Sequence, residues 1–300
     1  MPRSLKLNVI PAKAGTPLVG AANGELPDMS QEVPAFAGMT DAIGTSRSAK
    51  GILHTLAGDE PVTWQVPEEV PIAVQFNSQN YTVMMATPAD FEDFAIGFAL
   101  AEGLIARASD VTGVLVLPSA QGYAADLSVP AERIDFARMA RRSLEGRTGC
   151  GLCGIEDIKD AIRMPGRAVP DVRLSPQAVA RAYEQLPSFQ PMSRVNRTVH
   201  AAAWCSVDGE ILLSREDVGR HNGLDKLIGA LARADVDFAS GFVLMSSRCS
   251  FELVQKCAIA GIGALATVSA PTALALSLAR QAHLKLAALS NRGVMIFDKE

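Results

Sequence analysis

The second half of the chain alternates between short apolar runs and longer amphipathic runs, and no other sequence feature restricts the fold as much. Two of the apolar runs flank Asp208-Gly209, a pair typical of a β-hairpin turn. The predicted strands cover 199–207, 211–214, 241–246 and 264–269, and the predicted helices cover 176–186, 218–234, 251–262 and 272–285. Strands that alternate with helices in this way predict a three-layer α/β domain.

The part of the chain before this alternation is richer in β-type runs. Residues 72–76 and 81–85 are apolar runs separated by Asn, Ser and Gln, which are typical of turns. Thr87 and Pro88 suit the cap and the first turn of a helix, which we expect to continue through Ile105. A smaller β-rich α+β domain therefore precedes the α/β domain in our prediction. The predicted domains cover 49–145 and 146–300.

Residues 1–48 contain many Pro, Gly, Ala and Ser residues and show no sustained helical or strand period. Such a segment cannot bury enough apolar surface to fold, so we expect a disordered extension. The phrases at 9–15 and 33–40 also resemble translated bacterial intergenic repeat DNA. They suggest that the start of the reading frame is set too far upstream, and Met39 is one candidate for a later start.

The net charge and the cysteine content narrow the range of partners and compartments. A net charge of −4 spread over 300 residues provides no basic surface for nucleic acid. The cysteines number five, and the N-terminal residues lack the continuous apolar core of a secretory signal. We therefore expect a protein of the reducing cytoplasm that binds no nucleic acid.

The stretch 257–279 carries no charge and has the length of a membrane span. Its composition argues against insertion, because it is rich in Ala, Gly, Ser and Thr and contains Pro271, whereas Leu, Ile, Phe and Val favour insertion. We predict a helix, a strand and a second helix here, and no association with a membrane.

A pair of cysteines in a glycine-rich segment is the strongest chemical signal. The sequence Gly149-Cys150-Gly-Leu-Cys153-Gly154 follows Arg147, and we expect a loop over 133–154 that can expose sulfur. A thiolate is the reactive form of cysteine, and a neighbouring arginine or a helix N-terminus lowers the thiol pKa. The same thiolate can attack a persulfide by the chemistry of disulfide exchange.

Other interpretations of the pair fit less well. A structural zinc site needs about four ligands, yet Cys205, Cys249 and Cys257 are isolated. A thioredoxin-like pair is expected near the start of a βαβ pattern, and two inert buried cysteines do not suit a segment of glycines and arginines. A zinc deaminase needs His-x-Glu and Pro-Cys-x-x-Cys, but no Glu follows His200 at that spacing and Gly149 replaces the proline.

Polar residues follow two consecutive predicted strands. Ser246, Ser247 and Arg248 come directly after the strand at 241–246, and Ser269 begins the sequence Ser-Ala-Pro-Thr after the next strand. Ligands of α/β sheets bind beyond the carboxyl ends of strands, and free N–H groups at a helix start suit a phosphate. Two such ends side by side suit a diphosphate or a nucleotide. The chain has no Gly-x-x-x-x-Gly-Lys segment, so ordinary ATP or GTP hydrolysis is not expected.

Charged residues concentrate in the segment 214–222, which contains His221. In one interpretation Asp217 caps the following helix, while Arg220 and Glu216 form a solvated ion pair. In the other, these groups line a ligand cleft at the end of a strand. The sequence alone leaves both interpretations open.

Several of these motifs, taken in order, resemble the FdhD family, the formate dehydrogenase accessory sulfurtransferases. The resemblance covers about residues 50 to 297. The matching segments are Thr87-Pro88, Glu102-Gly103, Arg147-Thr-Gly-Cys150-Gly-Leu-Cys153-Gly154, His200-Ala-Ala-Ala-Trp204, Arg215-Glu-Asp-Val-Gly-Arg-His-Asn222 with Asp225-Lys226, Ser246-Ser-Arg248 with Ser250-Phe-Glu252, and Ser269-Ala-Pro-Thr272.

The resemblance implies an activity. A cysteine desulfurase would load sulfur onto Cys150 as a persulfide, with Cys153 in an auxiliary role. The protein would then bind a molybdenum cofactor, the bis-molybdopterin guanine dinucleotide form, and supply its sulfur before insertion into formate dehydrogenase. It also implies a cytidine-deaminase-like α/β domain, a homodimer and no metal of its own. A second hypothesis, from another class of protein, is a chaperone that binds the guanine nucleotide part of the cofactor without catalysis.

The resemblance further places cofactor binding near the C-terminus. The segment concerned consists of Leu289, Ser290, Asn291, Arg292, Gly293 and Val294, and it joins Ser246, Ser247, Arg248 and Ser269 as candidate cofactor-binding residues. This segment matches the family pattern loosely. Ahead of His200 the family commonly has Thr-Gly where this chain has Asn196-Arg197.

Overall fold

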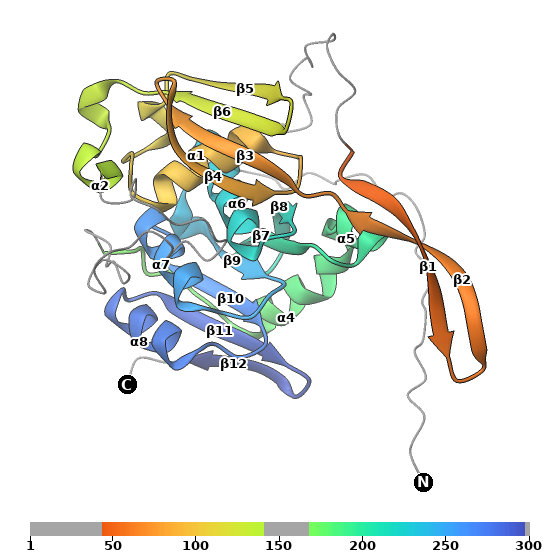
Figure 1. Cartoon of the computed structure of the whole chain (residues 1–300). Helices are drawn as coiled ribbons and strands as arrows, with labels where there is room; N and C mark the ends of the chain where they lie inside the picture. The colour runs from red at the N-terminus through yellow and green to blue at the C-terminus, as the bar shows by residue number, and fades with distance from the viewer. Residues whose placement is uncertain (1–43, 141–167, 298–300) are drawn as a thin grey trace. The chain divides into compact units, whose positions relative to one another are not determined.

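A six-stranded mixed sheet is the centre of the α/β part of the protein (Figure 1). We describe a computed structural model, in which residues 44–140 and 168–297 are defined and belong to one compact unit that begins at Ala42. The strand order is β12-β11-β10-β9-β7-β8, with β9, β10 and β11 parallel and the other neighbours antiparallel. The strands are β7 (His200–Ser206), β8 (Ile211–Asp217), β9 (Gly241–Met245), β10 (Ala264–Val268), β11 (Lys285–Ser290) and β12 (Gly293–Phe297).

Helices cover both faces of this sheet. They are α4 (Pro176–Gln185), α6 (Arg220–Arg233), α7 (Phe251–Ala260) and α8 (Ala273–Gln281). Side chains of a strand point alternately to the two faces, so Phe242 and Leu244 pack in the cluster that contains α4 residues, whereas Val243 and Met245 pack with α6, α7 and α8. The strands β7, β9, β10 and β11 are therefore buried on both sides, which explains why they are almost continuously apolar.

A second sheet of four strands, in the order β4-β3-β6-β5, packs its inner face on helix α1. Its elements are β3 (Val70–Phe76), β4 (Gln79–Ala86), α1 (Phe91–Ala101), β5 (Gly113–Ser119) and β6 (Gly122–Ser128). In β3, Val70, Ile72, Val74 and Phe76 are buried and the residues between them are partly exposed. This period of two gives the sheet one covered face and one outer face.

A two-stranded ribbon, β1 (Ser46–Thr55) and β2 (Gly58–Pro67), precedes the four-stranded sheet. Its contacts with the rest of the chain are mainly with α5 (Pro191–Asn196), where Asn196 Nδ2 donates to Ser46 Oγ at 3.1 Å. Almost all of its residues are exposed. The remaining short helices are η1 (Ala108–Asp110), η2 (Ala131–Arg133), α2 (Phe136–Ala140), η3 (Leu186–Phe189) and η4 (Phe238–Ser240).

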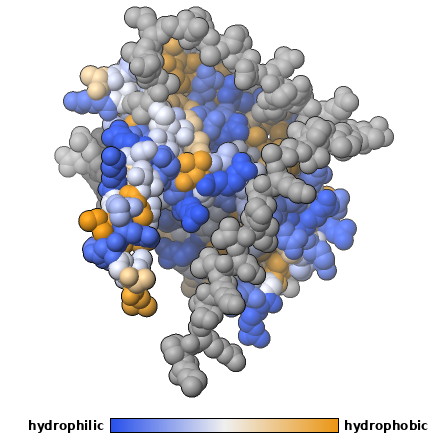
Figure 2. Space-filling view, turned by 90° about the vertical axis from the view of Figure 1, so that its right-hand side faces the viewer, coloured by the Kyte–Doolittle hydropathy of each residue, from blue (hydrophilic) through white to orange (hydrophobic). Residues whose placement is uncertain are grey.

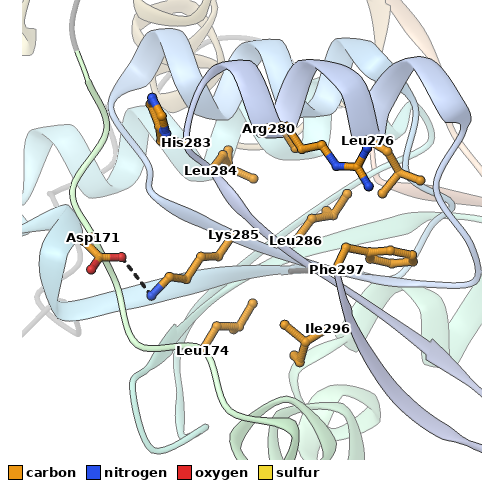
Figure 3. Close-up of a pocket in the computed structure, with 11 residues that line it drawn as sticks. Asp171, Leu174, Leu276, Arg280, His283, Leu284, Lys285, Leu286, Ile296 and Phe297 are labelled. Carbon is orange, nitrogen blue, oxygen red and sulfur yellow. Dashed lines mark ion pairs between the residues drawn. The ribbon is translucent and has the colours of Figure 1, made fainter. Parts of the chain in front are cut away.

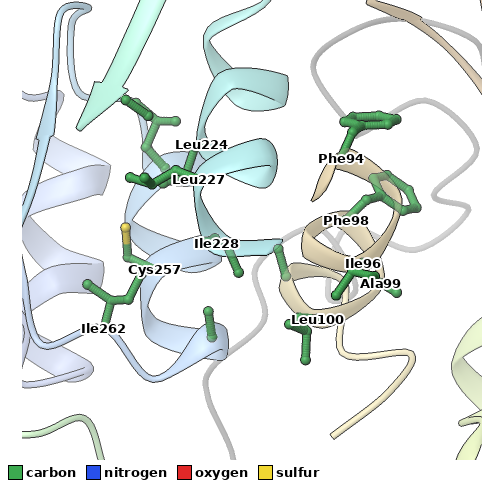
Figure 4. Close-up of a cluster of buried hydrophobic side chains, with 14 of the residues drawn as sticks. Phe94, Ile96, Phe98, Ala99, Leu100, Leu224, Leu227, Ile228, Cys257 and Ile262 are labelled. Atoms are coloured by element: carbon green, nitrogen blue, oxygen red, sulfur yellow. The ribbon is translucent and has the colours of Figure 1, made fainter. Parts of the chain in front are cut away.

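The crossing of α1 over α6 joins the two sheets into one core. Gly97 of α1 lies against the backbone of Asp225 and Gly229, and Gly229 lies against the backbone of Asp93. Because neither glycine has a Cβ, the helices approach to backbone contact, and apolar side chains from α1, α6 and α7 fill the space around the crossing (Figure 4). Residues of both sheets belong to this single cluster.

The structure confirms the mixed α/β architecture and most of the elements predicted from the sequence. The segment 257–279 forms the end of α7, then β10 and α8, as predicted. No helix within the described ranges is both long and apolar enough to cross a membrane. The predicted domain boundaries stay predictions, and the one between 145 and 146 falls outside the described residues.

Other expectations were wrong or incomplete. Helix α1 begins at Phe91 after Asp90, not at Thr87-Pro88, because Thr87 is used in a buried contact described below, and it ends at Ala101. The sequence patterns also missed the ribbon β1–β2, which begins within the expected extension, and the hairpin β11–β12. The ribbon was not predicted because it is exposed and lacks apolar runs. The hairpin was not predicted because β11 follows directly on the apolar period of α8.

We expect Gly97→Ala to lower the free energy of unfolding by about 1–3 kcal/mol, because the new Cβ would overlap the carbonyl oxygen of Asp225 and force the helices apart. Gly113→Ala is the matched control, since a Cβ there meets only Ser128 at 4.0 Å. Urea unfolding followed by circular dichroism measures both. Equal stability of the two variants would show that the α1–α6 crossing relaxes at little cost.

Candidate functional site

The polar residues predicted at the strand ends meet at one edge of the six-stranded sheet. The carboxyl ends of β9, β10 and β11 lie there because these strands are parallel neighbours. The antiparallel pairing of His200 with Asp217 brings the start of β7 and the end of β8 to the same edge. Adjacent ends are hydrogen-bonded, with Ser246 N donating to Ala201 O and Ser269 N donating to Leu289 O, each at 2.9 Å.

Not all of the predicted residues at this edge are available to a ligand. Ser246 Oγ accepts from Ala201 N at 2.8 Å, and the buried Ser247 hydroxyl donates to the carbonyl oxygen of Arg248 at 3.1 Å. Arg248 and Ser269 are exposed, and Ser269 adopts a left-handed backbone with φ 79°. The serines after β9 thus fix the loop, whereas Arg248 and Ser269 present polar groups to solvent.

The predicted C-terminal segment is the turn between β11 and β12. Leu289 is buried and Val294 packs beside it in the α4-side cluster, so both support the turn. Ser290 Oγ donates to Gly293 O at 3.0 Å and accepts from Arg292 N at 3.2 Å. Asn291 and Arg292 are exposed at the tip of this turn. The turn follows the end of β11, and that strand end lies beside Ser269, because Val268 and Leu289 are partners in register. Arg292 is therefore a second guanidinium group on this edge.

A recess of about 360 Å³ borders the edge on the side of α4. Ser246 and Val268 form one wall, and Tyr183, Glu184 and Gln190 belong to the opposite one. These three residues are not predicted from the sequence, because they lie in a helix and the turn after it. No motif points to them, and only the packing of α4 on the sheet brings them there.

The charged segment after β8 forms a buried network. Asp217 and Lys226 are fully buried, and Lys226 Nζ lies 2.7 Å from Asp217 Oδ2. Thr87 completes the network: its N–H donates to Asp217 Oδ2 at 2.9 Å, its carbonyl oxygen accepts from Lys226 Nζ at 3.0 Å, and its hydroxyl accepts from Val218 N at 3.0 Å. Asp217 is thus neither a helix cap nor part of a cleft wall, because it lies beneath the edge and ties β8 and α6 to the chain before α1.

Two further ion pairs extend this structural role. Arg215 donates to Asp93 through Nε at 2.9 Å and Nη2 at 2.8 Å. Lys256 of α7 donates to both carboxylate oxygens of Asp225 at 2.8 and 2.9 Å. The first pair joins β8 to α1 and the second joins α7 to α6, and both are largely buried, so these charges fix the positions of the helices on the sheet.

Glu216 does not form the predicted solvated pair with Arg220. Its carboxylate oxygens accept from Met192 N at 2.8 Å and Ser193 N at 2.9 Å, at the start of α5. Burial raises the pKa of Glu216, and the two backbone hydrogen bonds partly oppose this. The side chain therefore fixes α5, which carries the root of the ribbon.

His200, Arg220 and His221 are further ionisable groups at this edge. Burial, and next the positive charge of Arg220, lower the pKa of His200, so the neutral imidazole is favoured. Arg220 Nε is buried without a hydrogen-bond partner among the described residues. His221 Nε2 lies 3.5 Å from the hydroxyl of Ser250, the N-cap of α7, and 3.9 Å from Glu252. These groups can donate to an anionic ligand.

The three described cysteines are unsuited to nucleophilic chemistry. Cys205, Cys249 and Cys257 are free and buried, and burial raises the thiol pKa of each, to about 12 for Cys249. A protonated thiol is a poor nucleophile. Cys150 and Cys153, the predicted catalytic pair, lie outside the described residues. Within the described ranges no three His, Cys, Asp or Glu residues are grouped to hold a metal ion.

A larger pocket of about 470 Å³ lies at the opposite end of β11 (Figure 3). Arg280, His283 and Phe297 line it, and Lys285 Nζ lies 2.8 Å from Asp171. It contains none of the predicted cofactor-binding residues. The carboxyl edge therefore remains the candidate site, because polar groups at the start of β7 and after β9, β10 and β11 converge there.

Comparison with known proteins fixes the family. The family model described as the FdhD/NarQ family matches residues 67–299. The chain belongs to the FdhD/NarQ family. A sulfur carrier protein FdhD from Cupriavidus necator is 47% identical over 232 residues, which cover 77% of this chain and 81% of that protein. The protein of the same name from Bordetella petrii is 44% identical over 222 residues, which cover 74% of this chain and 80% of that protein.

A solved structure supports the fold of this FdhD/NarQ family chain. The crystal structure of a protein from Desulfotalea psychrophila, assigned as a formate dehydrogenase accessory protein, matches with a TM-score of 0.66. The match covers 85% of this chain and 97% of that chain, at 22% sequence identity. At this sequence identity the match supports the fold and nothing more.

We expect Lys226→Met to lower the free energy of unfolding by about 3–5 kcal/mol, because the substitution leaves the Asp217 carboxylate buried without its counter-charge. The control is Arg47→Met, which removes the ion pair between the exposed Arg47 side chain and Glu68 at the surface and should cost less than about 1 kcal/mol. Both values come from urea unfolding. A Lys226→Met variant as stable as the control would refute the structural role of the network.

Native alkylation tests the assignment of the thiols. At pH 8 a thiol of pKa about 12 is a thiolate in only about one molecule in ten thousand. Cys205, Cys249 and Cys257 should therefore resist iodoacetamide in the folded protein and react in urea, whereas Cys150 and Cys153 should react in both states. Peptide mapping by mass spectrometry gives the sites. Rapid native labelling of Cys249 would contradict the burial described above.

Proposed function

We propose that this member of the FdhD/NarQ family is a sulfur carrier that supports formate dehydrogenase. The observation that carries the proposal is the 44–47% identity, over about four fifths of their length, to proteins named sulfur carrier protein FdhD. A sulfur carrier needs a thiol that can become a thiolate. The burial of Cys205, Cys249 and Cys257 leaves Cys150 and Cys153 as the candidates among the five cysteines.

Cys150 is the proposed persulfide residue. Its thiolate would attack the outer sulfur of a persulfide on a cysteine desulfurase, so that one S–S bond forms on Cys150 as the other breaks and the desulfurase thiolate leaves. Arg147 and the surrounding glycines favour an accessible thiolate. Cys153 would have an auxiliary role. In this scheme the protein acts as a sulfurtransferase.

The proposed acceptor is a molybdenum cofactor, the bis-molybdopterin guanine dinucleotide form, held as a transient substrate at the carboxyl edge. Diphosphate groups suit the exposed guanidinium groups of Arg248 and Arg292 and the polar residues Ser269 and Ser290. Ser246, Ser247, Leu289, Gly293 and Val294 would shape these loops, and Asn291 would add an amide. A hairpin followed by three parallel strands also agrees with a cytidine-deaminase-like domain.

The same proposal specifies the partners and the compartment. The protein would work in the cytoplasm, accept sulfur from a cysteine desulfurase, deliver the modified cofactor to formate dehydrogenase, and form a homodimer. It would require neither nucleic acid nor a membrane. A chaperone that only binds the guanine nucleotide part of the cofactor is the alternative that the test below separates.

We expect an adduct of one sulfur atom on the protein after incubation with a cysteine desulfurase and cysteine. Intact-protein mass spectrometry before and after reduction detects it. The adduct should disappear in Cys150→Ala and persist in Cys153→Ala, the matched control from the same segment.

Activation of formate dehydrogenase is the second readout. Cys150→Ala should abolish activation, because no sulfur reaches the cofactor. Full activation by Cys150→Ala would instead support the chaperone. A wild-type protein that takes up no sulfur from an active desulfurase would remove the central step of the proposal.

A further inference from the structure

The pocket at the amino end of β11 combines an apolar floor with a charged rim. It has a volume of about 470 Å³ and lies between the end of α8, the first residues of β11, the last residues of β12 and the chain segment before α4 (Figure 3). This volume is within the usual range for sites that bind small molecules. The candidate site for the proposed function lies at the other end of β11, so the pocket is a separate feature of the protein.

Apolar side chains from three parts of the chain form the floor. Leu276 and Leu284 come from α8 and the turn after it, Leu286 comes from β11, and Ile296 and Phe297 come from β12. Leu284 and Leu286 are buried, whereas Leu276, Ile296 and Phe297 are only partly buried. A ligand with an apolar body would remove their remaining surface from water, which is favourable.

Charged groups surround this floor. Arg280 lies near the end of α8, His283 follows the helix, and Lys285 begins β11. The described part of the lining has one carboxylate, that of Asp171, whose side chain is 82% exposed and lies 2.8 Å from Lys285 Nζ. Two side chains that are always or usually cationic therefore face one carboxylate in this part of the lining, and the imidazole of His283 adds to the cationic side when protonated.

Backbone hydrogen bonds fix the rim. His283 has a left-handed backbone with φ 57°, and its N–H donates to Arg280 O at 3.1 Å. The N–H of Lys285 donates to Gly263 O at 2.9 Å. The helix thus ends and passes directly into β11, and the charged residues have defined positions. A site that is ordered before binding loses less conformational entropy when a ligand arrives.

The exposed apolar residues of the ribbon are arranged differently. Ile52 and Trp64 are 63% and 61% exposed. Ile52 pairs with Pro61 and Trp64 with Ala49, so the two side chains lie on opposite faces of the ribbon. Figure 2 views the protein from the side on which the ribbon lies in Figure 1, and apolar residues there stand among hydrophilic ones. Scattered apolar residues of this kind are normal on a protein surface, whereas the pocket gathers its apolar side chains in one place.

We propose that the pocket binds a small organic anion with an apolar body, namely an alkyl or aryl carboxylate. The apolar body rests on Leu276 and Phe297, and the side chain of Arg280 extends along the pocket toward these two residues (Figure 3). Its guanidinium group donates to the ligand carboxylate, a pairing that suits the planar geometry of both groups. Asp171 competes with the ligand for Lys285, because both present a carboxylate. The proposal is independent of the sulfur-carrier function.

Binding of octanoate to the full-length protein tests the proposal. The pocket has the volume of about 15 water molecules, which leaves room for this probe. We expect saturable shifts of the methyl NMR signal of Ile296, assigned with Ile296→Val, and an affinity that rises about fourfold for each CH₂ from butanoate to octanoate. Octanamide, which has the same body without the charge, should bind about tenfold more weakly. Phenylbutanoate is the aryl probe, and its affinity relative to octanoate identifies the preferred body.

Two substitutions with opposite effects locate the anion. Arg280→Gln should weaken octanoate binding about tenfold, because it removes the charged donor. Asp171→Asn should strengthen octanoate binding by up to about fivefold, because it removes the carboxylate that competes for Lys285. Neither should change the affinity for octanamide. The control is Arg181→Gln, which removes one positive charge at an exposed position of α4 outside the pocket and should bind octanoate like the wild type. Isothermal titration calorimetry gives the dissociation constants.

The same measurements can overturn the proposal. An Ile296 signal that octanoate does not shift, octanamide that binds as tightly as octanoate, or weaker octanoate binding by Asp171→Asn would each do so. Circular dichroism verifies that the variants are folded. If Arg280→Gln does not fold, Asp171→Asn still decides the question, because its side chain is largely exposed and a gain in affinity does not result from damage to the fold.

Discussion

The contact of α1 with α6 at Gly97 and Gly229 is the constraint on which the rest of the described structure depends. Because the two backbones touch, the four-stranded sheet and the six-stranded sheet share one apolar cluster. The same approach brings Thr87 over the end of β8, where its backbone and hydroxyl complete the partners of Asp217 and Lys226. A wider helix crossing would leave a fully buried ion pair short of hydrogen bonds.

In the candidate site, the buried charged residues and the exposed ones have different roles because of this arrangement. Asp217, Lys226 and Asp225 hold the helices below the edge of the sheet, while Arg248 and Arg292 on the loops above it remain exposed. A rigid base beneath exposed cationic loops is a suitable arrangement for binding a large anionic molecule, because the base fixes where the loops begin.

The sequence correctly predicted the strands and helices that have a clear local periodicity. It did not predict the contacts that arise only from the tertiary structure. The strands β7, β9 and β10 are apolar on both faces and the helices between them are amphipathic, so periodicity identified them. Periodicity also placed the ends of β9 and β10 side by side. It could not show that Thr87 serves β8 rather than α1, or that Tyr183 borders the edge, since neither fact depends on neighbours in sequence.

The network around Lys226 also affects the order in which the chain folds. Thr87 and Lys226 are 139 positions apart, so the polar partners that fix the start of α1 are synthesised long after α1 itself. At the usual rates of translation the delay is on the order of ten seconds. During that interval the apolar side of α1 that later meets α6 has no native cover. The native packing of the N-terminal half is therefore completed only when the C-terminal half emerges.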